Sequence, residues 1–168
     1  MRRYIIWAVV VIAAALLQTT WLDAFRVLGV TPNLMLLLVV YFGLMEGEER
    51  AMLTGVLGGL FQDVAGNNTL GHHILCLVVI GYAVGRISTR LVTDHPAVKA
   101  GVVFLASLAN GLAFTTIHYI QRPTTPAIET IIERVVPGAF YTALITPILF
   151  WLLDIIVGRF LVPQGSTT

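Results

Sequence analysis

The chain has 168 residues, of which 57% are hydrophobic and only 11% are charged, and its formal net charge is +1. Ordinary soluble domains carry roughly 25% charged residues, so this composition and a mean hydropathy of +0.88 indicate an integral membrane protein. The basic residues are scattered along the chain, which argues against nucleic acid as a partner.

Six hydrophobic segments follow one another, at residues 4–22, 33–46, 50–64, 70–89, 98–121 and 135–160. About 20 apolar residues cross a hydrocarbon core roughly 30 Å thick, so six crossings fill a chain of this length and leave no room for a soluble catalytic domain. The second and third segments are short, and either include polar flanking residues or pair as a shallow hairpin. We therefore predict a single all-α domain in the lipid bilayer, a six-transmembrane-helix bundle.

The basic residues also predict the orientation of this bundle. If the N-terminus is cytoplasmic, the cytoplasmic side holds Arg2, Arg3, Arg50, Arg86, Arg90, Lys99 and Arg159, whereas the other side holds Arg26, Arg122 and Arg134. Short cytoplasmic loops carry an excess of basic residues. We therefore expect both termini in the cytoplasm, and in a bacterium the inner membrane as the location.

Small residues recur every four positions in the third segment, at Ala51, Gly55 and Gly59, and Asp63 continues the series. This pattern lets two helix backbones approach closely, although it does not distinguish a neighbouring helix of the same chain from a partner's helix. Asp63 either takes part in proton or cation coupling, or is the polar end of its helix and meets water or backbone amides in the next turn. Asp154 in the last segment either has the same coupling role, or faces Arg159 or the cytoplasmic interface.

The run from Gly66 through Asn67 to Gly71 is a turn by composition, and it leads into the fourth segment. His72 and His73 follow it directly. Adjacent residues point in different directions on a helix, so these two cannot chelate one ion together. With no third ligand at metal spacing, we expect neither a metal site nor a cofactor.

A polar stripe runs along the fifth segment at spacings of three and four. It consists of Ser107, Asn110, Gly111, Thr115 and His118. Such a stripe either bonds to neighbouring helices or lines a ligand cavity, and the scarcity of charged or aromatic residues on it favours interhelical bonding. No nucleophile and base stand in a recognisable arrangement, so an enzyme is not expected.

Residues 127–135 have two interpretations. Their apolar positions recur at helical spacing and Pro137 follows, which is typical of a short helix lying on the outer interface. Alternatively, the last helix is long, begins near Ala127 and is kinked at Pro137.

One stretch of the chain resembles a known family. Pro32-Asn33-Leu34 opens an aliphatic helix, and Gly55, Gly58-Gly59-Leu60, Asp63, Gly66 and Leu70-Gly71 follow in order. In a six-helix chain of this size, these motifs are similar to those of the bacterial rod shape-determining protein MreD. Asn33 departs from the acid that is more common at this position of the family.

The resemblance implies a non-enzymatic membrane scaffold of the cell-elongation (peptidoglycan synthesis) machinery that helps to maintain rod cell shape. The implied partner is MreC, a single-pass protein, and the implied wider assembly includes RodA, its transpeptidase partner and MreB. It also implies a fold similar to the substrate-binding subunit of energy-coupling-factor transporters. That fold supplies an alternative function, a subunit that binds a vitamin-like molecule between the 66–71 turn and the polar stripe.

From these observations we predict that a partner's membrane helix or juxtamembrane segment packs on the third helix and the turn that follows it. The predicted contact residues are Ala51, Gly55, Gly59, Gln62, Asp63, Gly66, Asn67 and Gly71. An intramembrane enzyme would require Asp63 and Asp154 to meet at one depth, whereas the predicted topology places them near opposite faces.

Overall fold

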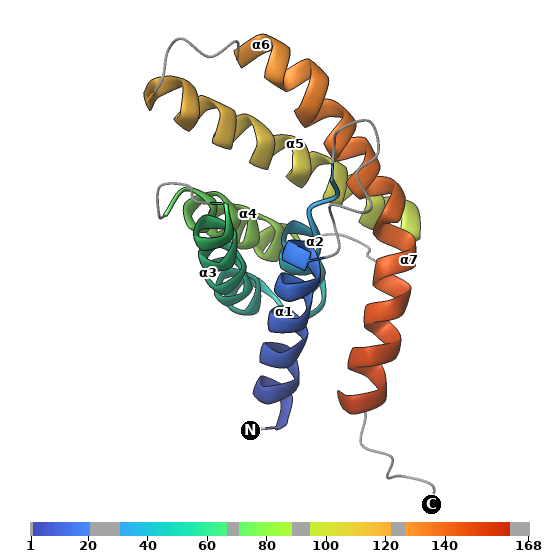
Figure 1. Ribbon diagram of the computed structural model, residues 1–168. Coiled ribbons are helices and arrows are strands. Elements are labelled where there is room, and N and C mark those ends of the chain that lie inside the picture. The colour runs from blue at the N-terminus through green and yellow to red at the C-terminus, as the bar shows by residue number, and fades with distance from the viewer. Residues whose placement is uncertain (1, 21–30, 67–70, 89–94, 122–126, 162–168) are drawn as a thin grey trace, which may run out of the picture.

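The computed structural model describes residues 2–20, 31–66, 71–88, 95–121 and 127–161, and every element in these ranges is helical. The helices are α1 (Arg2–Thr20), α2 (Leu34–Met45), α3 (Glu48–Ala65), α4 (His72–Ser88), α5 (Pro96–Gln121), α6 (Ala127–Thr130), the π-helical η2 (Ile131–Val135) and α7 (Val136–Leu161). Because α6, η2 and α7 are continuous, the described residues form six helices, as predicted. The start of α1 and the end of α7 lie at the same end of the molecule (Figure 1).

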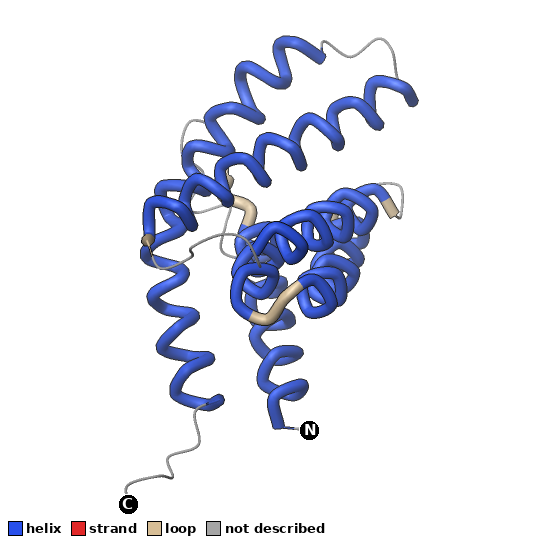
Figure 2. The backbone as a smooth tube through the Cα atoms, turned by 180° about the vertical axis from the view of Figure 1, so that it is seen from behind, coloured by secondary structure: helices blue, strands red, loops and turns tan. Residues whose placement is uncertain are grey.

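Helix α2 is the centre of the bundle. Its sequence is apolar on every side, and all eleven residues from Leu34 to Leu44 are buried. It is in contact with α1, α3, α4, α5 and α7. The tube drawn from behind shows helices and loops alone in the described residues (Figure 2). A helix that is hydrophobic all round is stable only when it is enclosed. At 1.5 Å per residue α2 is about 18 Å long, and its enclosure by protein makes this short length tolerable.

The first turn of α2 is capped by two amide side chains from different parts of the chain. Asn33 Oδ1 accepts a hydrogen bond from the Leu36 amide at 3.0 Å, and Gln18 Oε1 of α1 accepts one from the Met35 amide at 3.0 Å. The first amides of a helix have no partner within the helix, so these bonds stabilise the start of α2. Asn caps a helix about as well as Asp, which explains how Asn33 can stand at this position.

Of the two interpretations of residues 127–135, the structure has the long last helix and not a separate interfacial helix. The chain stays helical from Ala127 to Leu161 and passes through Pro137. Just before this proline the Val136 amide donates to the Ile131 carbonyl, five residues back. Proline lacks an amide hydrogen and clashes with the carbonyl of the preceding turn, and the wider π-turn accommodates both effects.

Two helical stretches are long and apolar enough to cross a membrane, at Pro96–Ile120 and Ile128–Ile156, while α1, α2 and α4 contain shorter apolar stretches. The surface of α7 carries a row of large exposed apolar side chains, Phe140, Leu144, Ile148 and Trp151. In water such a row would be unfavourable, whereas lipid chains solvate it well. The described helices therefore have the surface of a membrane protein.

Candidate functional site

The helices α3 and α4 form a hairpin in which the two backbones touch. A Cβ atom added to Gly59 would lie 2.5 Å from the backbone N and Cα of Ile74, and one added to Gly55 would lie 2.9 Å from the carbonyl of Leu77. From the other side, a Cβ at Gly81 would lie 2.9 Å from the Ala51 carbonyl. Each helix thus supplies small residues at the point where the backbone of the other approaches.

The position of α4 changes the interpretation of the small-residue face. Ala51, Gly55 and Gly59 are buried in the hairpin, so a partner's helix cannot pack on them while α4 is in place. The pattern was correctly assigned to close helix packing, but the neighbour is the same chain. These three positions are therefore not part of the surface that we propose below.

Asp63 joins the end of α3 to the start of α4. Its side chain is buried, and Oδ2 accepts a hydrogen bond from the Gly71 amide at 2.8 Å, while Oδ1 accepts one from the His73 amide at 3.1 Å. Gly71 has a φ of +106°, a backbone conformation that glycine adopts without strain. In this conformation the Gly71 amide points to the Asp63 carboxylate. Asp63 is thus the polar end of its helix, which was one of the two interpretations of this residue.

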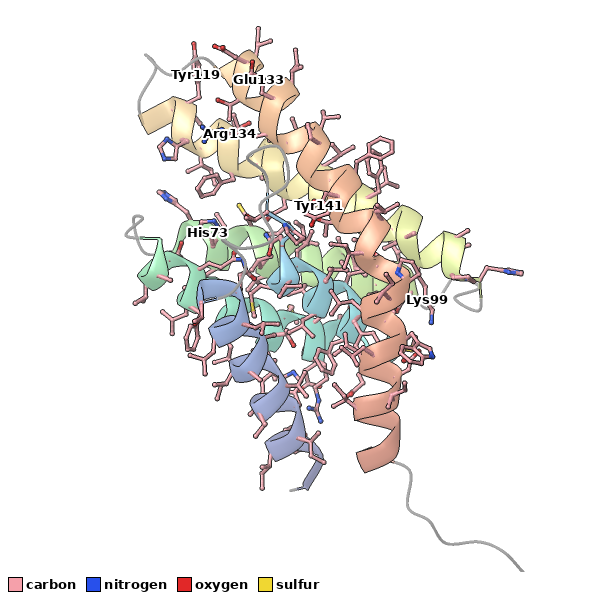
Figure 3. The ribbon with its side chains drawn as sticks, turned by 45° about the vertical axis from the view of Figure 1, so that its right-hand side comes forward. His73, Lys99, Tyr119, Glu133, Arg134 and Tyr141 are labelled. Atoms are coloured by element: carbon pink, nitrogen blue, oxygen red, sulfur yellow. The ribbon has the colours of Figure 1, made fainter. Side chains whose placement is uncertain are left out.

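His73, which the sequence analysis considered only as a metal ligand, belongs to this cluster. Its Nδ1 lies 2.8 Å from Asp63 Oδ1, and its ring stacks on Phe114 of α5 with 4.5 Å between ring centroids. Phe114 in turn contacts the ring of His118 at 5.6 Å. A chain of contacts therefore runs from α3 through α4 to α5. Figure 3 shows His73 at the start of α4, on the same side of the molecule as Tyr119 near the end of α5.

The other residues predicted around the turn have different environments. Gln62 Nε2 donates to Asn33 Oδ1 at 2.9 Å, which links α3 to the start of α2. Gly66 is exposed and ends α3, with its amide bonded to the Gln62 carbonyl at 2.9 Å. Asn67 lies outside the described residues. Gln62 and Gly66 are thus at the surface end of the hairpin, and Gly71 belongs to the Asp63 cap.

The polar stripe of α5 is partly enclosed. Asn110 and Thr115 are buried, whereas Ser107 and His118 are half-buried. Among the described residues Asn110 Oδ1 has no hydrogen-bond partner. The stripe therefore faces the interior of the bundle. However, the Asn110 Oδ1 atom does not make the predicted hydrogen bond to another helix within the described part of the chain.

Asp154 belongs to a second polar contact at the opposite end of the bundle. Its Oδ1 accepts a hydrogen bond from the Tyr41 hydroxyl at 2.8 Å. Tyr41 lies near the end of α2, close to the start of α3, whereas Asp63 lies near the end of α3. The two acids are thus separated along the length of α3 and cannot act on one substrate. Within the described residues, no three His, Cys, Asp or Glu side chains are grouped in a way that could hold a metal ion.

Comparison with known proteins identifies the family of the chain. No curated protein and no solved structure shows significant similarity to the chain. The family model described as rod shape-determining protein MreD matches residues 1–161, which is nearly the whole chain. The chain therefore belongs to the MreD family of rod shape-determining membrane proteins, which are non-enzymatic components of the cell-elongation machinery.

Proposed function

We propose that this chain is a scaffold that binds the membrane-spanning helix of the single-pass protein MreC in a groove between α4 and α5. The α3 face that the sequence suggested for this contact is covered by α4. A partner helix must therefore pack on another concave apolar surface, and the described residues contain one. The proposal rests on the groove between α4 and α5.

The groove has a volume of about 390 Å³ and an almost entirely apolar lining. Its lining comes from two neighbouring helices: Ile80, Ala83, Val84 and Ile87 of α4, and Val102, Leu105, Ala106 and Ala109 of α5. Three of these residues, Ala83, Ala106 and Ala109, are small and lie between larger side chains. The side chains of a second helix can pack into a groove of this kind between two ridges.

The position of the groove suits a helix that crosses the bilayer. It involves the second half of α4 and the first half of α5, and every residue that lines it is apolar. In lipid there is little hydrophobic gain from association, so helix binding depends on van der Waals contact over complementary surfaces. A groove lined by alanine offers more of this contact to a helix with bulky side chains than the convex surface of α7 does.

The test is co-purification of MreC with groove variants of the full chain. Ala83 and Ala109 are exposed, so Ala83→Phe and Ala109→Phe fill the groove without disturbing the core. We expect each variant to lower MreC recovery at least fivefold, with unchanged yield and thermal stability. The matched control is Ala13→Phe, because Ala13 is an exposed residue of α1 and does not line the groove.

Two results would count against the proposal. Undiminished MreC recovery with both groove variants would exclude this surface, and an equal loss with Ala13→Phe would show that the added phenyl group acts through the membrane in general. We further propose that both termini are cytoplasmic, because the basic residues of the short loops favour that side. Labelling of single cysteines added at each terminus, in intact and permeabilised cells, tests the orientation.

A further inference from the structure

A polar pocket lies where α1 ends, α2 begins and α3 ends. Its volume is about 250 Å³, and it is lined by Ala15, Gln18, Met35, Phe61, Gln62 and Ala65. Four of its six lining residues are apolar, and the amide side chains of Gln18 and Gln62 supply its polar groups. The pocket is separate from the α4/α5 groove, which other helices form.

The amide of Gln62 is held in one orientation. Its Nε2 donates to Asn33 Oδ1, and Asn33 is itself held by the Leu36 amide. The Gln62 Oε1 atom is buried and has no hydrogen-bond partner among the described residues. Buried polar oxygens are nearly always paired in native proteins, so an unpaired one beside a cavity indicates a group that is supplied from outside.

Gln18 offers the complementary group. Its Oε1 already accepts a hydrogen bond from the Met35 amide at 3.0 Å. A carboxamide carries its donors on the nitrogen, so Gln18 has its amide hydrogens to offer to a molecule in the pocket. The pocket therefore presents one oriented acceptor and one donor.

These features define the chemistry of the ligand. It needs an N–H or O–H for Gln62 and an oxygen for Gln18, which a secondary amide provides with its own N–H and C=O. None of the lining residues carries a charge, and burial of an unpaired charge would be very costly, so the ligand is neutral. The volume is about eight times the roughly 30 Å³ that a water molecule takes up in the liquid, which suits a small molecule.

We propose that this pocket binds a small neutral molecule through a secondary amide group. This inference does not depend on MreC binding, because it involves another surface of the chain. It also differs from a site between the 66–71 turn and the polar stripe, since none of the stripe residues lines the pocket.

The first experiment compares two sugars that differ at one substituent. Purified full-length protein in lipid nanodiscs is titrated with N-acetylglucosamine, which carries a secondary amide, and with glucose, which has a hydroxyl in its place. We expect saturable binding of N-acetylglucosamine and at least tenfold weaker binding of glucose. Equal binding of both sugars, or no binding of either at millimolar concentrations, would overturn the proposal.

The second experiment closes the pocket from its rim. Ala65 is exposed and lines the pocket, whereas its neighbour Val64 is exposed and does not. Ala65→Trp should abolish the binding of N-acetylglucosamine, and the matched control Val64→Trp should retain it. Gln62→Leu should weaken binding at least tenfold, and if this variant fails to fold, the rim variants decide. Full binding by Ala65→Trp would place the sugar elsewhere and refute this site.

Discussion

In the α3/α4 hairpin each helix presents small residues to the backbone of the other, whereas α5 meets the continuous helix of η2 and α7 through side chains. A Cβ at Gly59 would touch backbone atoms of Ile74, while a Cβ at Gly111 would touch side-chain atoms of Val135. Phe104 of α5 also packs edge-on against Phe140 of α7, with 5.1 Å between ring centroids. A side chain can rotate away from a new neighbour and a helix backbone cannot. Glycines in the two helix pairs should therefore tolerate substitution very differently.

The largest effect is expected for Gly59→Ala. The new methyl group cannot fit without separating α3 from α4, because the nearest atoms are the backbone N and Cα of Ile74 at 2.5 Å. Overpacking of a tight contact costs typically 1–3 kcal/mol, and we expect a loss of about 3 kcal/mol here. Unfolding in mixed detergent micelles, followed by circular dichroism, measures this change in the free energy of unfolding.

The control for this variant is Gly101→Ala. Gly101 is an exposed residue of α5, and a Cβ there would have no atom within 4 Å. Since alanine favours a helix by about 0.5–1 kcal/mol over glycine, this change should leave the protein as stable or more stable. Similar losses for both variants would mean that the hairpin is not held by backbone contact.

The second largest effect is expected for Asp63→Ala. The variant leaves the amides of Gly71 and His73 and the His73 ring without their acceptor. Hydrogen bonds to a charged group contribute about 1.5–3 kcal/mol each, and because water reaches the turn more easily than the core we expect a total loss of about 2 kcal/mol. Thermal unfolding monitored by intrinsic fluorescence gives the difference.

Asp154→Ala serves as the comparison for Asp63. Asp154 is exposed and accepts a hydrogen bond from Tyr41, so its removal should cost about 1 kcal/mol or less. If Asp154→Ala is the more damaging of the two, Asp63 is not the main polar link of the hairpin.

The smallest effect is expected for Gly111→Ala. The nearest atom is a methyl group of Val135, which a change of the Val135 rotamer can move away. The Val135 Cβ at 3.2 Å then needs only a small shift. An off-rotamer side chain costs about 0.5–1.5 kcal/mol, and the better helix propensity of alanine offsets part of it. We expect a net loss of less than 1 kcal/mol in the same detergent assay. A loss as large as that of Gly59→Ala would remove the distinction between the two helix pairs.

The sequence predicted the six helices and the small-residue face well, because hydrophobic length and four-residue spacing are local patterns. Apart from the start of the last helix, the helix ends lie within two residues of the predicted ones. The neighbour of the small-residue face could have been suspected, since Gly81 and Gly85 repeat the same spacing in the fourth segment. Their contact with α3 nevertheless depends on how the hairpin folds.

Other features depend on residues that are far apart in the chain. Gln62 binds Asn33 across 29 positions, and Trp7 Nε1 donates to Thr54 across 47. No local pattern connects such residues. The π-turn before Pro137 was also missed, because a proline in a helical pattern predicts a kink or an end equally well, and the packing of α7 decides between them.

Because most of the helices that enclose α2 are synthesised after it, α2 first enters the membrane without its final neighbours. During synthesis α2 emerges before the helices α3, α4, α5 and α7 that cover it. Tyr41 must wait for Asp154, which is made 113 residues later, before its hydroxyl finds this acceptor. The Tyr41 hydroxyl of the newly made helix therefore lacks this acceptor until the last helix is in place. A chain that stops before α7 should accordingly be an attractive substrate for membrane quality-control proteases.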